Sequence, residues 1–517
     1  MKRRTVVMGL TVGAAVPAVG FASGARAASR TSAASSAAST DSSLVFDPSS
    51  YTELTTSITD TTGTAHEVVH HFYKVASYVV NPVDATYQSL NVSVPVKIDG
   101  SIVDASGAPI LFANQVGGYM PSSVANATGI GAGGGMGPGG PGGPAERRSA
   151  HADSAASRQQ LALAAGYVVV EPGARGRSLV DSSGTYYGTA PAAIVDLKAA
   201  VRYVKFNKGR IPGNVDRIVS AGVSAGGALS SLLGASGDSP VYDSYLRELG
   251  AADASDAIFA TGAWCPITDL EHADMAYEWN WGANLLSSGS AVDQTISKAL
   301  SSAYGDYLAS LRLTAKGFGT LTARNLDEYL VRTHLEPSAT QYLAALSAAD
   351  RATYLAANSF ITWSGGRAAF SWADFLTHVG ARKKNTPAFD AFDLSAPENN
   401  EFGTGTTANR HFTLYSLRHE EGASARLDSD IPAKLHLMNP MYHLVDRVNE
   451  HRSKHWWIRL GTKDSDTALT VAGNLAARLK NLGDDVDTSY YWDAGHGADN
   501  DPGDFVKWIA TVSGYRS

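Results

Sequence analysis

The sequence predicts an α/β fold, in which a mostly parallel sheet is covered by helices and carries a large insertion. Between residues 159 and 264, short apolar runs rich in β-branched residues alternate with helical patterns. One of these runs, Ile218–Ala221, passes through a turn of small residues directly into a helix. The alternation stops after Asp269 and returns only at His455, an interval far too long for a simple loop.

Composition supports one large α/β domain with a substantial insertion. The chain has 517 residues, of which 44% are hydrophobic, and this is enough for a real core. Its 42 Lys and Arg against 49 Asp and Glu give a net charge of -7 without a long basic run, so we expect no nucleic-acid partner. Cys265 is the only cysteine, which excludes an intramolecular disulfide; we expect it to be a small buried apolar residue.

The first residues have the pattern of an export signal. Lys2-Arg3-Arg4 precedes an apolar run over 6–21, and Ala25-Arg26-Ala27 offers small residues for cleavage. We therefore predict a cleaved signal over residues 1–27, compatible with the twin-arginine route, and a flexible Ala/Ser/Thr leader over 28–43. No later run is long and apolar enough to cross a bilayer, so the predicted mature protein is soluble and extracellular.

The remaining elements follow in chain order. The runs over 71–80 and 90–96 predict an antiparallel pair at a sheet edge, and the Gly/Pro tract over 129–144 predicts a mobile surface loop. Further strands are expected at 108–114, 166–172, 218–221, 256–264, 455–461 and 486–492, and helices at 159–165, 190–207, 468–482 and 505–509.

The interval without strand pattern predicts an inserted domain. We expect a catalytic domain over 44–270 and 451–517, and a mainly helical lid over 271–450. Within the lid, the patterns predict helix pairs at 311–335 and 344–360 and an irregular loop at 383–405.

The turn after Ile218–Ala221 contains Gly222-x-Ser224-x-Gly226. A serine on so sharp a turn between strand and helix is held in strained backbone geometry, and residues two before and two after it must be nearly free of side chain. The pattern alone is common in a chain with 51 glycines. Its strand and helix context favours a nucleophilic serine over a turn that merely packs closely.

A nucleophilic serine needs a base and a group that orients the base. In this kind of fold the order along the chain is Ser, acid, His, with the last two after late strands. His496 directly follows the last predicted strand, and Asp464 follows the strand that ends at Leu460. Other acids also lie at suitable strand ends: Asp466, Asp499 and Asp269.

The oxyanion formed during ester cleavage needs two donors aimed at it in advance. We expect one from the backbone N–H of Ala225, directly after the nucleophile, and the other from Gly117 or Gly118 in the loop after the third strand. Asp196, inside a predicted helix, is expected to be a structural partner of neighbouring loops.

Three motifs together resemble a known family. They are the stretches 222–234, 265–270 and 461–467, and they are similar to the bacterial tannases, which are tannin acyl hydrolases of the α/β-hydrolase superfamily. The resemblance covers most of the chain from about residue 65. It implies a triad of Ser224, Asp464 and His496, in agreement with the chain order.

The resemblance also implies a clamp for the three hydroxyls of a galloyl ring. The family supplies a Lys, a Glu from the inserted domain and an Asp two positions after the triad acid, which fall on Lys384, Glu398 and Asp466, with Lys383 as an alternative lysine. An ammonium between carboxylates satisfies adjacent phenolic hydroxyls, whereas a methoxy group would leave a carboxylate unpaired. Without the resemblance, the sequence would predict that these residues are solvated charges on a lid loop.

The sequence therefore predicts a secreted serine esterase that cleaves galloyl esters and depsides. An esterase for feruloyl or other aromatic acyl groups and a non-catalytic polyphenol-binding protein are the alternatives. A peptidase of the same fold is disfavoured because the sequence has no repeat that would supply a propeller cap. No cofactor or metal is expected, because His70-His71 and His272-x-Asp274 lack two further ligands at workable spacing.

Overall fold

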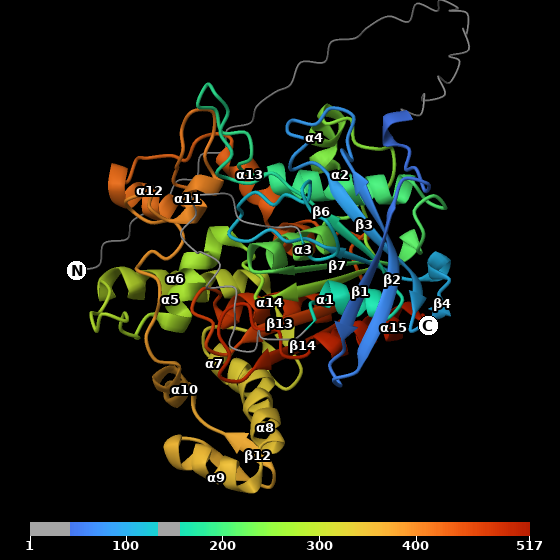
Figure 1. The fold of residues 1–517 in the computed structure, drawn as a ribbon. Helices are drawn as coiled ribbons and strands as arrows, with labels where there is room; N and C mark the ends of the chain where they lie inside the picture. The colour runs from blue at the N-terminus through green and yellow to red at the C-terminus, as the bar shows by residue number, and fades with distance from the viewer. Residues whose placement is uncertain (1–41, 133–155, 517) are drawn as a thin grey trace, which may run out of the picture. The chain divides into compact units, whose positions relative to one another are not determined.

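A mixed β-sheet runs through the protein, and the helices are arranged around it (Figure 1). The computed structural model describes residues 42–132 and 156–516, and within them the sheet has ten strands in the order β1-β2-β3-β6-β5-β7-β8-β13-β14, with β4 paired to β3. Its strands are β1 (Thr52–Thr59), β2 (Ala65–Val75), β3 (Leu90–Ile98), β4 (Ser101–Ile102), β5 (Ile110–Ala113), β6 (Val168–Pro172), β7 (Ile218–Val223), β8 (Ala260–Trp264), β13 (His455–Gly461) and β14 (Asp485–Tyr491). The pairs from β6 to β14 are all parallel, so the predicted fold class is confirmed.

The N-terminal edge of the sheet differs from the prediction. β2 and β3 pair antiparallel as expected, but β2 ends at Val75, and the edge strand is β1, which pairs with β2 over its whole length. β1 was not predicted, because this Thr- and Ser-rich strand is mostly exposed and has no strong apolar alternation. The predicted signal, almost all of the leader and most of the 129–144 tract lie outside the described residues.

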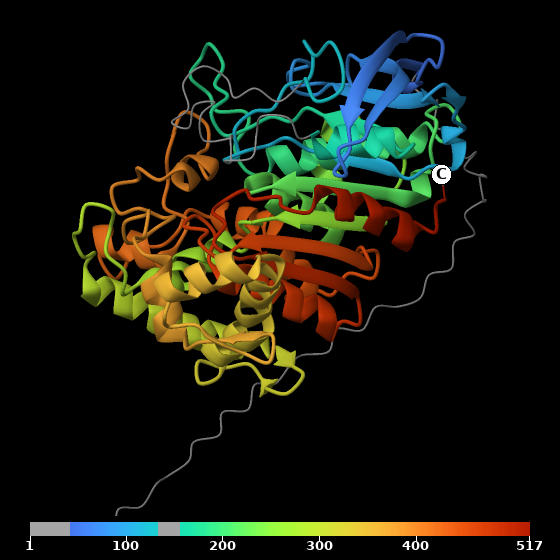
Figure 2. The same cartoon turned by 60° about the horizontal axis from the view of Figure 1, so that its bottom comes forward.

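Two apolar cores lie on opposite faces of the sheet. Alternate residues of β5 point to different cores: Ile110 and Phe112 pack with α2 (Ala192–Phe206) and α3 (Ala225–Ala235), whereas Leu111 and Ala113 pack with α1 (Arg158–Ala164) and α15 (Pro502–Ser513). This alternation follows from the two-residue period of a strand. Both faces of the central strands are therefore covered (Figure 2).

The chain between β8 and β13 leaves the sheet and is mainly helical. Its helices are α5 (Leu270–Trp281), α6 (Gln294–Leu311), α7 (Leu326–Leu330), α8 (Glu336–Ala345), α9 (Ala348–Ala357), α10 (Trp372–Val379), α11 (Pro397–Glu401), α12 (Leu414–Glu421) and α13 (Ile431–Met438). The first half of the predicted helix pair over 311–335 is wrong, because α6 ends at Leu311 and a short hairpin, β9 (Thr314–Ala315) with β10 (Gly319–Thr320), follows it. The second half is helical, since α7 continues into a π-helix over Val331–Leu335. A second hairpin pairs β11 (Thr362–Ser364) with β12 (Arg367–Ala369).

The other helices are α4 (Asp243–Glu248) and α14 (Leu469–Asn481). The described residues belong to one compact unit, which contains both the sheet and this long segment. None of the described helices has the length and apolar character needed to cross a bilayer.

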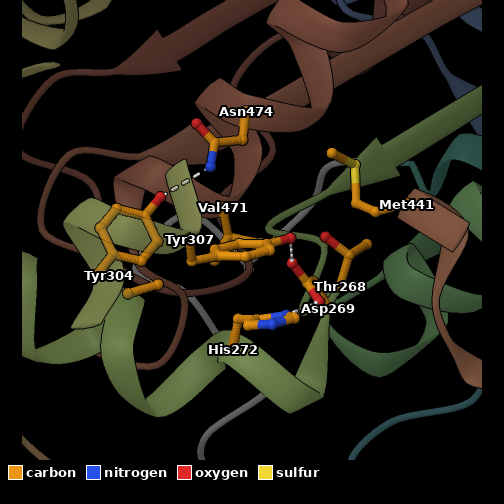
Figure 3. Close-up of a pocket in the computed structure, with 9 residues that line it drawn as sticks. Thr268, Asp269, His272, Tyr304, Tyr307, Met441, Val471 and Asn474 are labelled. Atoms are coloured by element: carbon orange, nitrogen blue, oxygen red, sulfur yellow. Dashed lines mark hydrogen bonds and ion pairs between the residues drawn. The ribbon is translucent and has the colours of Figure 1, made fainter. Parts of the chain in front are cut away.

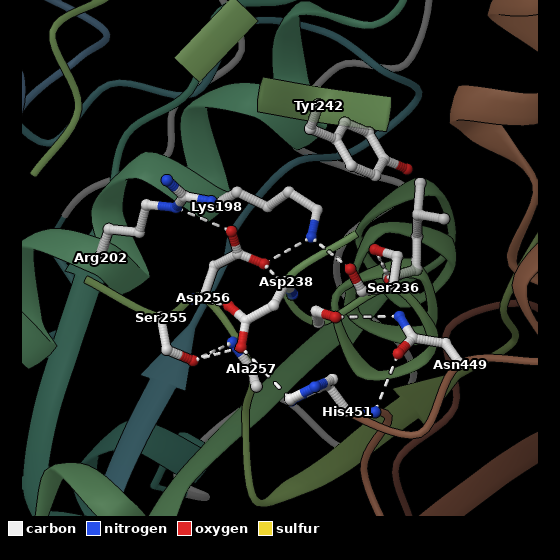
Figure 4. A network of polar contacts seen from close by, with 12 residues as sticks. Lys198, Arg202, Ser236, Asp238, Tyr242, Ser255, Asp256, Ala257, Asn449 and His451 are labelled. Carbon is white, nitrogen blue, oxygen red and sulfur yellow. Dashed lines mark hydrogen bonds and ion pairs between the residues drawn. The ribbon is translucent and has the colours of Figure 1, made fainter. Parts of the chain in front are cut away.

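A buried ion network fastens α2 to the helix that follows Ser224 (Figure 4). Lys198 of α2 donates to Asp256 at 2.7 Å and to the Ser236 carbonyl, at the end of α3, at 2.8 Å. Arg202 donates to the other Asp256 oxygen at 2.8 Å. Because Lys198 and Asp256 are 0% and 1% exposed, each charge depends on the other to offset its loss of hydration.

Replacing Lys198 by Met should lower the free energy of unfolding by about 3–5 kcal/mol, since it leaves a buried carboxylate short of a partner. Denaturant unfolding followed by circular dichroism measures the change. Lys208→Met is the matched control, because Lys208 and Asp216 form an exposed pair at 2.8 Å and should contribute less than about 1 kcal/mol. Equal losses in the two variants would contradict a role for the buried network.

Candidate active site

Ser224 lies at the turn between β7 and α3, in a backbone conformation that side chains rarely adopt. Its φ is 59° and its ψ is −122°. A Cβ on Gly222 would lie 2.2 Å from the Gly226 carbonyl oxygen, and a Cβ on Gly226 would lie 2.6 Å from the Val116 carbonyl oxygen. Both glycines are therefore required by close backbone contacts, and the turn presents the Ser224 hydroxyl beyond the end of β7.

The structure brings together the three side chains that the chain order predicts. His496 Nε2 lies 2.9 Å from Ser224 Oγ, and His496 Nδ1 lies 2.9 and 3.0 Å from the two Asp464 oxygens. A carboxylate only accepts hydrogen bonds, so Nδ1 carries a proton and, in the neutral ring, Nε2 is free to accept the Ser224 hydroxyl hydrogen. This is the geometry that a serine nucleophile with its base requires.

Backbone donors hold Asp464 in place. Its Oδ1 accepts the N–H groups of Asp466 and Thr467, each at 2.8 Å, and its side chain is fully buried. The Lys463 N–H also donates to the Ala494 carbonyl at 2.9 Å, which joins the loop of the acid to the loop of the histidine.

The competing acids are engaged elsewhere. Asp269 receives the Tyr307 hydroxyl, lies 2.8 Å from His272 Nδ1 and accepts from Asn439 at 2.8 Å, and the His272 and Tyr307 rings stack at 3.6 Å (Figure 3). Asp499 accepts from the Trp264 indole at 3.1 Å. Of the acids that the sequence offered as partners of the histidine, Asp464 is the one that binds His496, whereas Asp269 and Asp499 have other partners.

The carboxylate of Asp464 controls the charge of His496. Burial by itself lowers the pKa of His496, but the attraction of Asp464 outweighs it and raises this pKa above the usual imidazole value, with Cys265 adding to the rise. The Cys265 sulfur, the Asp464 carboxylate and a His496 nitrogen lie within 4.8 Å of one another. Cys265 is buried, as predicted, but its contact with His496 was not foreseen, and only its position at the end of a central strand hinted at it.

Ser224 and His496 face a cavity of about 350 Å³ that is also lined by Val116 and Gly117. Gly117 therefore lines the same cavity as Ser224, whereas Gly118 is exposed and does not line it. The Ala225 N–H belongs to the first turn of α3, where backbone donors lack partners within the helix.

Arg177, which the sequence analysis did not single out, fixes the loop that carries Gly117. Its Nε donates to the Gly118 carbonyl at 2.8 Å, and its Nη1 donates to the Asn400 side chain, on α11, at 3.0 Å. It thus links the loop after β5 to the segment between β8 and β13. No local pattern marks such an arginine, because its partners are distant in sequence.

The three predicted clamp residues make different contacts in the structure. Asp466 pairs with Lys383 at 3.0 Å; burial raises the pKa of Asp466, but the charges of His496, Lys384 and Lys383 outweigh this and lower it. The Lys384 ammonium lies 3.8 Å from the centre of the Phe389 ring. Glu398 is buried, and its Oε2 has no hydrogen-bond partner within the described part of the chain.

The remaining sequence candidates have structural surroundings. Asp196 is fully buried and accepts from Arg175 at 2.8 Å and from Gln88 at 2.8 Å, in agreement with a structural role. Asp274 accepts the N–H groups of Phe389 and Asp390. His71 stacks on the Tyr51 ring at 3.6 Å.

Comparisons with known proteins agree with this geometry. The BD-FAE family model matches residues 142–304. Each of three solved structures covers 91% of this chain and matches over 99% of its own: a tannin acyl hydrolase in complex with 3,4-dihydroxybenzoate (36% identity, TM-score 0.76), a tannin acyl hydrolase in complex with ethyl gallate (36%, 0.75) and the tannase of Fusobacterium nucleatum (35%, 0.74). No curated protein matches the chain.

Asp464→Asn should lower kcat/KM for ester hydrolysis by about 10³–10⁴-fold and move its acid limb to lower pH. The base works only when His496 is neutral, and loss of the carboxylate charge lowers the pKa of His496, so the ring loses its proton at lower pH. The pH profile of kcat/KM measures both effects. Asp269→Asn is the control, and an acid limb that moves in this variant and not in Asp464→Asn would contradict the assignment.

Proposed function

The chain belongs to the tannase family of α/β-hydrolases, and on this premise we propose that it is a serine esterase that cleaves galloyl ester and depside bonds and releases gallic acid. The line of hydrogen bonds from Asp464 through His496 to Ser224 carries the proposal. Two of the solved relatives are complexes with 3,4-dihydroxybenzoate and ethyl gallate, which supports a polyhydroxylated aromatic acyl group.

In the first half of the reaction, Ser224 Oγ attacks the ester carbonyl carbon while His496 Nε2 takes the hydroxyl proton. The N–H groups of Ala225 and Gly117 stabilise the negative charge on the carbonyl oxygen. When the intermediate collapses, the bond between the carbonyl carbon and the alcohol oxygen breaks, and His496 gives its proton to that oxygen. Galloyl-Ser224 remains.

Water completes the cycle. His496, neutral again, takes a proton from water as the water oxygen attacks the acyl carbon, and then returns that proton to Ser224 Oγ. Gallic acid leaves. No step needs a cofactor, because the proton moves only between the substrate, water, Ser224 and His496.

Lys384, Glu398 and Asp466 are proposed to hold the three ring hydroxyls. Support comes from the position of Asp466. Its backbone N–H donates to Asp464, and the nearby charges of His496 and Lys384 lower the pKa of its carboxylate. The unpartnered Glu398 Oε2 supports a role for this carboxylate as a hydrogen-bond acceptor, because a buried acceptor left unpaired costs free energy. A ring that lacks one of the hydroxyls would leave one of these groups without a partner.

We also propose that the enzyme is exported. Support comes from the basic residues 2–4, the apolar run over 6–21 and the small residues 25–27, which lie outside the described residues.

The wild type should hydrolyse methyl gallate with a kcat/KM about 100-fold or more above that for methyl ferulate, because the methoxy group of ferulate cannot satisfy the clamp. Acid release, followed by chromatography, measures both rates. Ser224→Ala should lower both by about 10⁴-fold or more. Release of gallic acid by this variant at the wild-type rate would overturn the esterase, and a preference for ferulate would overturn the clamp.

Lys384→Met should lower kcat/KM for methyl gallate by about 30-fold or more, mainly by raising KM, because the ring hydroxyls lose a charged donor. Lys383→Met is the matched comparison, since the two lysines are adjacent and Lys383 is half exposed and paired with Asp466. In Lys383→Met, kcat/KM for methyl gallate should fall by less than about 3-fold. A larger decrease in Lys383→Met than in Lys384→Met would assign the clamp position to Lys383.

A further inference from the structure

The cavity at Ser224 extends to polar side chains that neither the proposed triad nor the proposed clamp uses. Besides Ser224 and His496, the cavity is lined by Gln115, Arg158 and Gln159. These last three residues are here called the polar wall. None of the clamp residues lines it. At about 350 Å³ the cavity lies within the range of sites that take small organic molecules.

The polar wall has hydrogen-bonding groups without partners. Gln159, half-buried on α1, makes no side-chain hydrogen bond with any described residue. The Arg158 guanidinium stacks on the Trp264 ring at 3.8 Å and pairs with Asp499 at 3.5 Å, and its Nη1 has almost no exposed surface. The Gln159 amide is therefore the group of the polar wall that is left to bind a ligand, and it offers both donors and an acceptor.

The wall is also held in place before any ligand binds. A capping box fixes the start of α1, and the stack on Trp264 holds Arg158. Gln115 donates to the buried Glu171 at 2.8 Å, and Glu171 also receives the Gly131 N–H. Such fixed groups lose little conformational entropy when they bind a ligand.

The chemistry of the triad decides which part of the ester faces this wall. His496 Nε2 must reach the oxygen of the departing alcohol, so the alcohol leaves on the side of Ser224 where His496 is exposed to the cavity. The aromatic acid lies toward the clamp, which lines no part of this cavity. The alcohol therefore points to the polar wall.

We propose that the polar wall is the binding site for the alcohol part of the ester and selects polyhydroxylated alcohols, such as sugars, over methanol. This inference rests on the proposed esterase function. A neutral polyol suits the wall because its amides offer both donors and acceptors and Asp499 offsets the charge of Arg158.

The same site would bind an alcohol that replaces water in the second half of the reaction. A sugar hydroxyl oxygen then forms the bond to the acyl carbon of galloyl-Ser224, the bond from that carbon to Ser224 Oγ breaks, and His496 passes the hydroxyl proton to Ser224 Oγ. With methyl gallate as donor and glucose as acceptor, the wild type should therefore form galloyl glucose beside gallic acid.

Gln159→Ala tests the site, because the Gln159 side chain makes no hydrogen bond with the described residues that the substitution would remove. The kcat/KM for galloyl glucose divided by that for methyl gallate should fall about 3–10-fold, as expected for one or two lost hydrogen bonds. The fraction of methyl gallate converted to galloyl glucose should fall by a similar factor. Arg158→Met should lower the same ratio, with thermal unfolding measured alongside.

Gln341→Ala is the matched control. Gln341 is exposed on α8 and does not line the cavity. The ratio of the two kcat/KM values in Gln341→Ala should match that of the wild type. An unchanged ratio in Gln159→Ala, or an equal change in Gln341→Ala, would overturn the alcohol site while the esterase stands, whereas a wild type that hydrolyses no galloyl ester would overturn both.

Discussion

The left-handed backbone of Ser224 is the constraint on which the rest of the site depends. It turns the chain from β7 into α3 within one residue, and it is possible only because Gly222 and Gly226 bring backbone atoms closer than any Cβ permits. Asn114, after β5, holds the turn by donating to the Gly226 carbonyl at 3.1 Å and to Ser230 at 2.9 Å. The neighbouring strand thus offsets the strain at Ser224.

Parallel strands explain how a long segment is accommodated beside this turn. β8 and β13 are neighbours in the sheet although 190 residues separate them in the chain, so the segment leaves one strand and returns to the next without interrupting the ladder. It leaves at the carboxyl end of β8, the edge where Ser224, Asp464 and His496 also lie. α5 begins directly beyond this edge, and Asn400 of α11 accepts from Arg177, which also binds the Gly118 carbonyl.

Much of the fold and the proposed triad could be predicted from local patterns. β7 and β13 are buried strands with continuous apolar runs, and Ser224 and Asp464 follow them. His496 follows β14, which is less buried but alternates in strand fashion. The exposed strand β1 lacks that periodicity, and the segment after Leu311 resembles a helix although it forms a hairpin. In a partly buried strand or helix, the apolar pattern that would predict the element from the sequence is weak.

The sequence by itself determined the order of strands and helices and the residue types at the turn, because apolar period and glycine spacing are local properties of the chain. Only the tertiary structure decided which of several strand-end acids meets His496, that Cys265 lies beside it, and that Arg177 holds the loop of Gly117. The polar wall likewise brings Gln115, which follows β5, and two residues of α1 to the same cavity. Such contacts depend on how distant segments pack, and distances between distant segments leave no periodic signal in a single sequence.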